Sequence, residues 1–446
     1  MLLKMKSNLY PVVLKNAGIA LTAALLGLHS EADAQSTSVA PALPVIPGGV
    51  YNITSYGAKG DGIATNTVAI QTAIDAASKA GGGTIEVPGG VFLSGPIRLA
   101  NHIALRVDTG ATLRMLPIDK YPGGTSNPDS FISGSRLHDI AIAGSGTIDG
   151  QGSPWWPYAR QRNARRPRMI ALSSCERVLI ENVLLTNSPI FHIAISGPSA
   201  DVTVRRVTIR APASTDPVNP SHNTDACDVT AKRVLVQDCD VSVGDDNFTC
   251  AGGTSEVLIT NCTYGYGHGV SIGSPTSGGI SNFTVVNCTF NNTDQGIRIK
   301  TDRDRGGYLH NLSYLNLRMT NVGFPILVYC SYMATNREYR ALNTLTPAIA
   351  ASYPARRITS RTPVYRDITF SNITATVQPG RRAGLLWGLP EMAITNVLLQ
   401  KVYITADKPF GIYEAQGVRL LDCRITTPEG LNKISCTNAQ VIIASP

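Results

Sequence analysis

The chain has 446 residues, of which 43% are hydrophobic and 16% charged, so it holds enough apolar sequence for a sizeable folded core. Its 39 Lys and Arg outnumber its 31 Asp and Glu, which gives a formal net charge of +8. The cations are scattered and only 6% of the residues are aromatic, a composition that disfavours a nucleic-acid-binding module. A basic chain of this kind suits an acidic polymer as its partner.

The first 34 residues have the pattern of a secretory signal peptide. Lys4, Lys6 and Lys15 precede a short apolar run, and residues 32–34 (Ala-Asp-Ala) offer a small-residue cleavage site. The run holds about 12 apolar residues, fewer than the roughly 20 that span a bilayer, which disfavours a membrane anchor. We therefore expect a secreted protein, extracellular or periplasmic, without membrane association after the segment is removed. We also expect a monomer.

A leader and one helix are predicted next. Residues 35–48 are rich in Ser, Ala and Pro, so we expect a flexible leader. Residues 66–80 show the amphipathic pattern of a helix that ends at three consecutive glycines. Its apolar side is expected to hold Val68, Ile70, Ile74 and Ala77.

The rest of the chain contains an internal repeat. An alternating β-rich stretch reaches a polar residue, often Asn, and the alternation then resumes. Up to Asn316 these polar positions are 23 to 32 residues apart. They are Asn182, Arg206, Asp238, Asn261, Asn287, Asn316 and Asn372. Because Asn tolerates left-handed geometry, we expect it at an inward turn of each repeat, where its amides form a hydrogen-bonded ladder.

This repeat predicts an all-β fold, a single-stranded right-handed parallel β-helix, or solenoid. The regular Leu spacing of a leucine-rich repeat is missing, and a β-sandwich would not keep one phase over so many units. An open-ended solenoid needs a cap at its edge, and the predicted helix at 66–80 is the candidate. We expect one domain over residues 49–446, because stacked coils share a continuous core.

Nine cysteines in an exported chain could indicate a disulfide framework. Cys239, Cys262, Cys288 and Cys423, however, occupy one and the same position of the repeat. Small apolar side chains stacked inside a repeating core explain that pattern as well as bridges do. We expect one or two disulfides at most.

Four short polar motifs occur between residues 223 and 300 at about one-repeat intervals. They are Asn223-Thr224-Asp225, Gly244-Asp245-Asp246-Asn247, Gly267-His268-Gly269 and Arg298-Ile299-Lys300. Asp245 lies seven residues past one repeat position and His268 seven past the next, so the two should be neighbours on adjacent coils. Gly244 is expected to permit a bend that brings both following carboxylates to solvent.

The other two motifs fit the same surface. Asp225 precedes Asp245 by 20 residues, close to one coil, although a Pro-rich insertion at 212–220 makes its placement less certain. Arg298 and Lys300 are two residues apart on a predicted strand and therefore share a face. Taken singly, these motifs are commonly an acidic turn, a cap or a solvated edge. Together they gather like charges that need a reason to coexist.

The grouped residue types point to hydrolysis of an acidic sugar chain. Glycoside hydrolysis needs a carboxylic acid to protonate the leaving oxygen and a carboxylate to act as base or nucleophile. Crowded carboxylates repel, so one of them keeps its proton to a higher pH, and an imidazole nearby tunes the balance. Arg and Lys offer charged donors to a carboxylate on the substrate.

The motifs resemble those of the polygalacturonase family, glycoside hydrolase family 28. Further matches are GTIDGQG at 146–152 with Trp155-Trp156, NSP at 187–189, and a start at 55–90 similar to that of many pectin-active β-helix enzymes. The resemblance covers about residues 50–425. Ala226 and Asn247 depart from the residues usual after the first two motifs, which leaves the subfamily open.

The resemblance implies an inverting, metal-free and cofactor-free hydrolysis of α-1,4-galacturonosyl bonds in polygalacturonate or pectin. By matching position, Asp245 would be the general acid, Asp225 and Asp246 would activate water, and His268 would support the acid. The substrate would be bound by Asn223, Arg298, Lys300 and a tyrosine of the following coil, for which Tyr332 is the first candidate and Tyr329 the second.

Three alternatives remain. A related hydrolase could act on rhamnogalacturonan or xylogalacturonan, or release terminal galacturonate. A pectate lyase on the same fold would need Ca²⁺ and an Arg base, which the Asp pair with His268 disfavours. A non-catalytic polysaccharide-binding β-helix would be insensitive to loss of Asp245.

Overall fold

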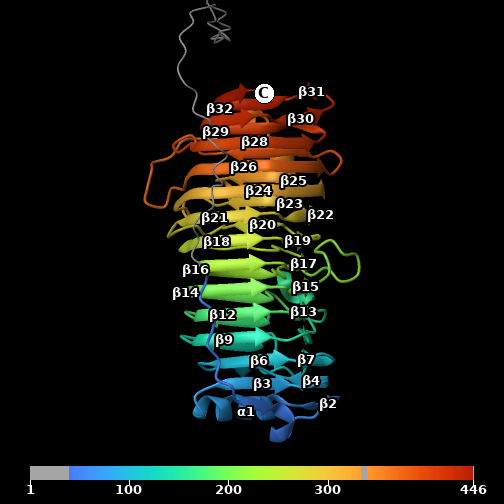
Figure 1. The fold of residues 1–446 in the computed structure, drawn as a ribbon. Helices are drawn as coiled ribbons and strands as arrows, with labels where there is room; N and C mark the ends of the chain where they lie inside the picture. The colour runs from blue at the N-terminus through green and yellow to red at the C-terminus, as the bar shows by residue number, and fades with distance from the viewer. Residues whose placement is uncertain (1–39, 333–338, 445–446) are drawn as a thin grey trace, which may run out of the picture. The chain divides into compact units, whose positions relative to one another are not determined.

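The computed structural model describes residues 40–332 and 339–444, and the predicted signal peptide lies outside them. Strands stack in successive coils from helix α1 (Thr67–Lys79) to β32 (Ile434–Ala444), as Figure 1 shows. Within the described residues every strand pair is parallel except β30 (Arg424–Thr427) with β31 (Gly430–Leu431). The predicted parallel β-helix is confirmed.

Each coil contributes to three parallel sheets. The site sheet consists of β5 (Ile97–Arg98), β8 (Ile132–Ser135), β11 (Ile170–Ser173), β14 (Ile193–Arg205), β16 (Cys227–Gln237), β20 (Val270–Ile272), β23 (Gln295–Lys300), β25 (Phe324–Tyr329), β27 (Arg382–Trp387), β29 (Lys408–Leu421) and β32. Single bridges from Phe248 and Thr249 connect β16 with β20. Side chains along these strands alternate between the core and the outer face of the sheet.

The second sheet follows the site sheet around a corner, and several strands bend to serve both. It consists of β1 (Val50–Asn52), β3 (Gly83–Val87), β6 (Ile103–Val107), β9 (His138–Ala143), β12 (Glu176–Glu181), β14, β16, β18 (Thr254–Thr260), β21 (Ile280–Val286), β24 (Tyr308–Val322), β26 (Val364–Val377), β28 (Ile394–Thr405), β29 and β32. One apolar cluster of Ile, Val, Leu and Phe fills the interior from Ile53 to Ile425.

The third sheet closes each coil. It consists of β2 (Asp61–Thr65), β4 (Gly90–Ser94), β7 (Ala111–Met115), β10 (Thr147–Asp149), β13 (Leu184–Thr186), β15 (Thr208–Arg210), β17 (Asp240–Ser242), β19 (Thr263–Tyr264), β22 (Thr289–Asn291), the later parts of β24, β26 and β28, and β30. Two 3₁₀ turns, η1 (Ile53–Tyr56) and η2 (Trp156–Arg160), lie in connections.

The repeated polar residue marks the corner between the second and third sheets. All seven predicted positions have a positive φ, between 53° and 60°. The amide ladder is present, since Asn316 donates to Asn287 at 3.1 Å and Asn372 donates to Asn316 at 2.9 Å. The predicted inward direction was wrong: these side chains are exposed, because the corner turns its left-handed residue outward.

The nine cysteines are all free thiols. Cys239, Cys262 and Cys288 are buried at equivalent points of successive coils, as the repeat predicted. Their sulfur atoms form no disulfide bonds and instead fill the interior as small apolar groups. Cys436, in β32, is the exposed member of the set.

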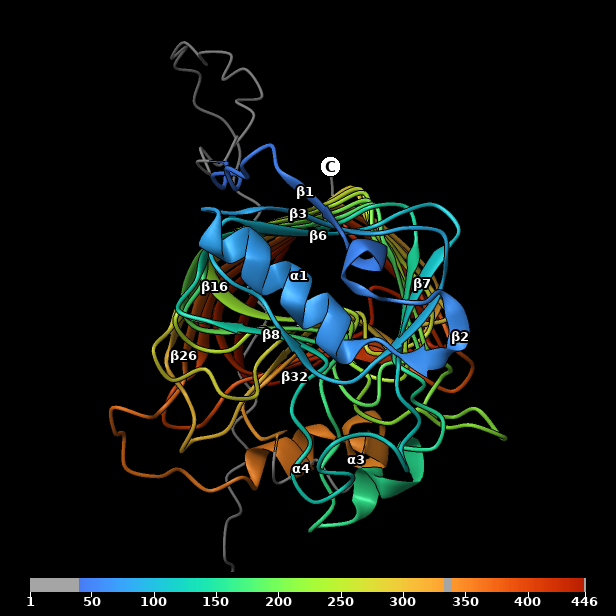
Figure 2. The same ribbon diagram turned by 90° about the horizontal axis from the view of Figure 1, so that it is seen from below.

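Helix α1 lies across the end of the stack (Figure 2). Ile70, Ala73, Ile74 and Ala77 are buried against the first coil, which confirms the predicted cap. Val68 was wrongly placed on the apolar side, since it is 79% exposed in the first helical turn. Among the described helices none has the length and apolarity of a membrane span.

The described part of the expected leader is attached to the stack. The backbone N–H of Ala42 donates to Asp201 at 3.1 Å, and that of Val45 donates to Asp139 at 2.9 Å. Each carboxylate also accepts hydrogen bonds from an arginine of the next coil: Asp201 from Arg233, and Asp139 from Arg177. Residues 40–48 therefore run as a strap that two hydrogen bonds hold to this side of the second sheet.

A long connection after β25 covers part of the site sheet. It contains α3 (Tyr339–Thr344) and α4 (Pro347–Ala351), which lie outside the coils in Figure 2. Leu342 and Leu345 pack against Leu327, Trp387 and Tyr413, outward-facing residues of β25, β27 and β29. The outer face of the sheet is thus buried beyond β23.

Candidate active site

The center of the site is a buried carboxylate clamped by two cations. Asp246 is 3% exposed, and Arg298 donates to its Oδ1 while Lys300 Nζ donates to its Oδ2 at 3.0 Å. Ser271 Oγ adds a hydrogen bond of 2.6 Å and is itself held by Arg298 Nε. Burial opposes the charged form, but Arg298 and Lys300 hold the pKa of Asp246 well below its usual range.

The predicted access of both adjacent carboxylates to solvent was therefore wrong for Asp246. Gly244 permits a close approach of two turns: a Cβ there would lie 2.0 Å from the Ser221 carbonyl oxygen. Just after this close approach, the Asp246 side chain lies over the outer face of the site sheet, where it contacts Arg298 on β23. Asp245 is left at the opening, with a side chain 21% exposed.

Asp225 completes a group of three carboxylates. One oxygen from each of Asp225, Asp245 and Asp246 lies within 4.8 Å of the others. Burial, and then the charges of Asp245 and Asp246, raise the pKa of Asp225 well above its usual value, with Lys300 opposing. Its backbone is fixed by His192, whose backbone N–H donates to the Asp225 carbonyl oxygen at 2.8 Å. The Pro-rich insertion does not move Asp225 away from the group.

His268 lies beside Asp245, as their shared phase predicted. Its Nε2 is 3.7 Å from Asp245 Oδ1, and its Nδ1 is 3.2 Å from Asp294 Oδ2. The two carboxylates flank the imidazole on opposite ring nitrogens, an arrangement that favours this orientation of the ring. Asp294 was not predicted, although it follows His268 by 26 residues, close to one coil.

Asn223 bridges Asp245 and an arginine. Its Nδ2 donates to Asp245 Oδ2 at 3.3 Å, and its Oδ1 accepts from Arg166 at 3.0 Å. Arg166 also donates to the carbonyl oxygens of Pro189 and His222, so it is fixed in place. Burial lowers the pKa of Arg166 to about 10, while Asp225 and Asp245 act in the opposite direction.

Tyr332 covers Lys300. The Lys300 ammonium lies 5.2 Å from the center of the Tyr332 ring, and the Tyr329 ring meets Tyr332 edge-on at 6.2 Å. Tyr329 is 1% exposed and belongs to the apolar cluster under α3 and α4. Of the two tyrosines considered, Tyr332 is the one that borders the cations.

Sequence reasoning missed a group of arginines. The segment 160–168 holds five of them, which contradicts the statement that the cations are scattered. Arg160 Nη2 lies 3.2 Å from His222 Nε2, and Arg166 donates a hydrogen bond to Asn223. The charge of Arg168 acts to lower the pKa of Asp228. Their clustering in nine residues was the available signal.

Asp228 was also missed. It is the second residue of β16 and is half-buried on the outer face of the site sheet. Burial and the charge of Asp246 raise the pKa of Asp228 to about 6, while Arg168 and Lys300 act in the opposite direction. A cavity of about 180 Å³ is lined by Arg168 and Asp228 and by residues 171–173 of β11 and 194–196 of β14.

A second cavity, of about 290 Å³, is lined by Trp156, Arg160 and His222. Both cavities therefore border the residues next to the carboxylates and carry arginine. A carboxylate-bearing chain entering either would meet a cation. A much larger cavity is bordered by the turns that follow β20 and β23, and none of these residues lines it.

Two groups among the described residues could supply three metal ligands. They are Asp225 with Asp245 and Asp246, and His102 with His138 and Asp139. In the first, Arg298 and Lys300 already bind both oxygens of Asp246, so a cation would meet two positive charges. In the second, Arg177 binds both oxygens of Asp139. Neither donor set fits a metal, and the expectation that none is needed stays a prediction.

Comparison with known proteins assigns the family. The model of glycosyl hydrolases family 28 matches residues 78–419. An endo-polygalacturonase of Pectobacterium parmentieri is 28% identical over 430 residues, which cover 88% of this chain and 96% of that protein. An exopolygalacturonase of Zea mays is 29% identical over 355 residues, covering 76% and 80%.

A solved structure agrees. The polygalacturonase of Erwinia carotovora ssp. carotovora matches with a TM-score of 0.67 and 27% identity, over 85% of this chain and 98% of that one. Because the family match spans well over half of the residues, and includes all the carboxylates and cations of the site, the chain belongs to glycoside hydrolase family 28.

Proposed function

We propose that this glycoside hydrolase cleaves α-1,4-galacturonosyl bonds of polygalacturonate or pectin in an exported setting. The observation that carries the proposal is the three-carboxylate group with Asp246 clamped by Arg298 and Lys300. Relatives named endo-polygalacturonase and exopolygalacturonase support the substrate class. A hydrolase of neutral glycans would have no use for so many cations around its carboxylates.

The proposed roles follow from exposure and charge. Asp245 is the general acid, because it is the most exposed of the three carboxyls and can reach a glycosidic oxygen. Asp246 stays ionised and, together with Asp225, accepts a proton from the attacking water. The raised pKa of Asp225 means that this residue acts as a base only after it has lost its own proton.

The substrate carboxylate is bound next to the clamp. Arg298 and Lys300 lie on the same face as Asp246, with Tyr332 over Lys300. A second carboxylate, on a neighbouring sugar, would meet Arg166 at Asn223 or Arg168 at Asp228. We propose binding roles for Asn223, Arg298, Lys300 and Tyr332, and add Arg166 to them.

Incubation of the purified chain with polygalacturonic acid tests the activity. We expect new reducing ends without ultraviolet absorption at any time, and activity that persists in EDTA. Unsaturated, absorbing products or loss of activity in EDTA would instead indicate a lyase. A ladder of oligomers indicates endo action, and monomer alone indicates exo action.

Stereochemistry needs its own measurement. The nearest oxygens of the trio are within 4.8 Å, whereas carboxyl pairs lie about 6.5–9.5 Å apart in inverting enzymes and about 5–5.5 Å apart in retaining ones. Inversion is proposed from the family resemblance. Proton NMR of the first product formed should show the β-anomer, and a first-formed α-anomer would indicate retention.

Asp245→Asn tests the acid. It is expected to fold like the natural chain and to lose about 10² to 10⁴-fold in kcat, the usual effect of removing a general acid. Arg419→Ala, an exposed substitution far along the stack, serves as the control that keeps full activity. An Asp245→Asn variant with more than roughly a tenth of the natural rate would exclude this role.

A further inference from the structure

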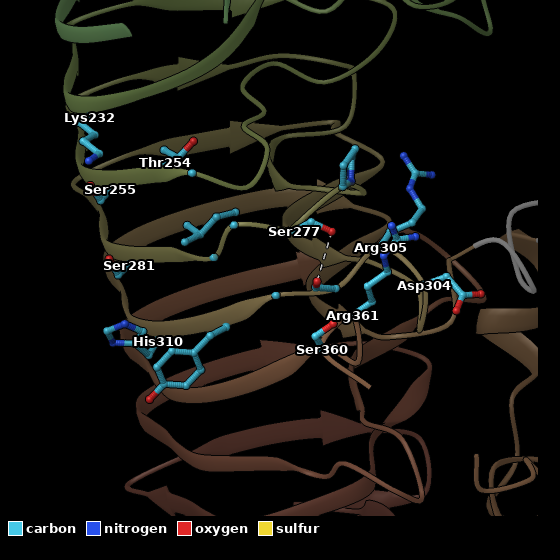
Figure 3. A pocket seen from close by; sticks show the side chains of 18 residues that line it. Lys232, Thr254, Ser255, Ser277, Ser281, Asp304, Arg305, His310, Ser360 and Arg361 are labelled. Carbon is cyan, nitrogen blue, oxygen red and sulfur yellow. Dashed lines mark hydrogen bonds between the residues drawn. The ribbon is translucent and has the colours of Figure 1, made fainter. Parts of the chain in front are cut away.

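A cavity of about 900 Å³ lies outside the catalytic group (Figure 3). It is bordered by the turns that follow β20 and β23, by the first residues of β18, β21 and β24 in the second sheet, and by Lys232 in the middle of β16. None of the carboxylates, cations or aromatic residues assigned to the active site lines it. The proposed hydrolysis does not involve this cavity.

One wall of the cavity is a ladder of polar side chains in register. Lys232 pairs with Ser255, Ser255 with Ser281, and Ser281 with His310, on β16, β18, β21 and β24. Neighbouring strands are about 4.8 Å apart, so the ladder offers one polar group at each such step. That step is comparable to the span from O1 to O4 of one pyranose ring, so a linear sugar chain along the ladder would meet a donor at each unit.

The opposite wall comes from loops and is basic. Arg305, from the turn after β23, and Arg361 lie there with the hydroxyl of Ser360, and Asp304 is the single carboxylate that lines the cavity. Lys232 and Arg361 are exposed and form no ion pair with any described residue. Cations that are not neutralised within the chain favour an anionic ligand.

An aromatic ring completes the site. Tyr308 is 45% exposed and its ring is stacked on His310, with centroids 4.4 Å apart and planes inclined by 24°. A ring supported in this way offers a flat apolar surface next to hydrogen-bond donors. Sugars present apolar C–H faces together with hydroxyls, which matches this pairing better than a free inorganic anion would.

We propose that this cavity is a second saccharide site that binds an acidic stretch of the polymer substrate away from the catalytic group. Lys232 and Arg361 bind its carboxylates, the ladder binds its hydroxyls, and Tyr308 stacks on a sugar face. The inference rests on the proposed function only for the nature of the polymer. Two sites on one polymer raise the effective concentration of bonds at the catalytic group.

Native electrophoresis through gels containing polygalacturonate tests the proposal, with every variant built on Asp245→Asn so that the polymer is not cut. Lys232→Ala with Arg361→Ala removes two cations from the cavity. Arg419→Ala with Lys433→Ala removes the same charge from exposed positions elsewhere. Tyr308→Ala removes the stacking surface without a change of charge.

The mobility of each variant is compared with its mobility in a polymer-free gel, and the ratio gives an apparent Kd. We expect the cavity double variant to weaken binding roughly tenfold, the equivalent of about 1.4 kcal/mol. Tyr308→Ala should weaken it several-fold, and the control double variant should change it less than about twofold. A neutral galactan in the gel should retard none of them.

Equal Kd values for the cavity and control double variants would overturn the site. Loss of binding that millimolar sulfate reproduces, with Tyr308→Ala unchanged, would reduce it to an inorganic anion site. Hydrolysis by the natural chain is measured separately. An inactive chain whose retardation still depends on the cavity contradicts the proposed function, whereas an active chain without that dependence contradicts the second site.

Discussion

Two buried carboxylates of one group have their pKa values moved in opposite directions. Asp246 touches both cations and its pKa is lowered, whereas Asp225 has no such partner and its pKa is raised. Both are below 10% exposed, so the difference comes from what faces each oxygen and not from burial itself. The same substitution should therefore have opposite effects on stability at the two positions.

Asp225→Asn should raise the melting temperature at pH 7. A raised pKa means that the folded chain holds the proton to a higher pH than the unfolded chain, so the stability it contributes is complete below the ordinary Asp pKa. That contribution is lost as the pH rises through the raised value. Asn keeps the neutral form at every pH, so its advantage should shrink toward pH 4, although turnover falls about 10² to 10⁴-fold.

Asp246→Asn should do the reverse. It leaves Arg298 and Lys300 buried without their carboxylate, which costs about 3–5 kcal/mol when one partner of a buried ion pair is removed. Chemical denaturation of the two variants beside the natural chain measures both. If Asp246→Asn were as stable as Asp225→Asn, the clamp would carry no energetic weight.

Lys300 should set the acid limb of the pH profile. Its charge lowers the pKa of both Asp225 and Asp246, so Lys300→Met should move the loss of kcat/KM to a higher pH, besides weakening substrate binding. Lys300→Arg keeps the charge and should leave the limb in place. Profiles of kcat/KM against pH for both variants provide the measurement, and an unmoved limb in Lys300→Met would show that neither carboxylate governs it.

At the scale of the element, each coil depends on its left-handed corner. Asn316 has a φ of 54° and links Asn287 and Asn372 through its amide. A residue with a Cβ is strained there, and a branched one most of all. The left-handed corner and the amide ladder contribute separately to the stability of the coil. Different substitutions of Asn316 can distinguish the two contributions.

Asn316→Val should destabilise the chain more than Asn316→Gly. Both variants lose the two amide bonds, but only Val adds the strain of about 1–2 kcal/mol that a left-handed conformation imposes. Denaturation midpoints of the two variants give the difference directly. Equal midpoints would mean that the corner relaxes out of its left-handed form.

At the scale of the whole molecule, stacked coils leave unpaired strand edges at the ends unless something covers them. Ile74→Lys places a charge under α1, where Ile74 is 1% exposed, and should release the cap and promote self-association. Val68→Lys, on the exposed side of the same helix, is the matched control. Light scattering after size-exclusion chromatography distinguishes them, and a monomeric, equally stable Ile74→Lys would exclude a capping role.

The sequence was sufficient for the repeat because a left-handed corner restricts residue choice, so Asn recurs with a readable phase. That phase also placed His268 beside Asp245. It could not show which way the corner side chains face, because that depends on the geometry of the left-handed corner between two sheets. It could not show that Asp246 would be buried, because that depends on how neighbouring coils approach at Gly244. Arg166 and the α3–α4 cover lie in connections outside the repeat, where no periodicity constrains position.

The free thiols have a practical consequence. Eight of the nine cysteines are buried or half-buried, whereas Cys436 is exposed in the last strand. A maleimide dye should therefore attach at one terminus of the solenoid without touching the catalytic face. The molecule carries a natural attachment point for tethering it to a surface and watching single polymer chains being processed.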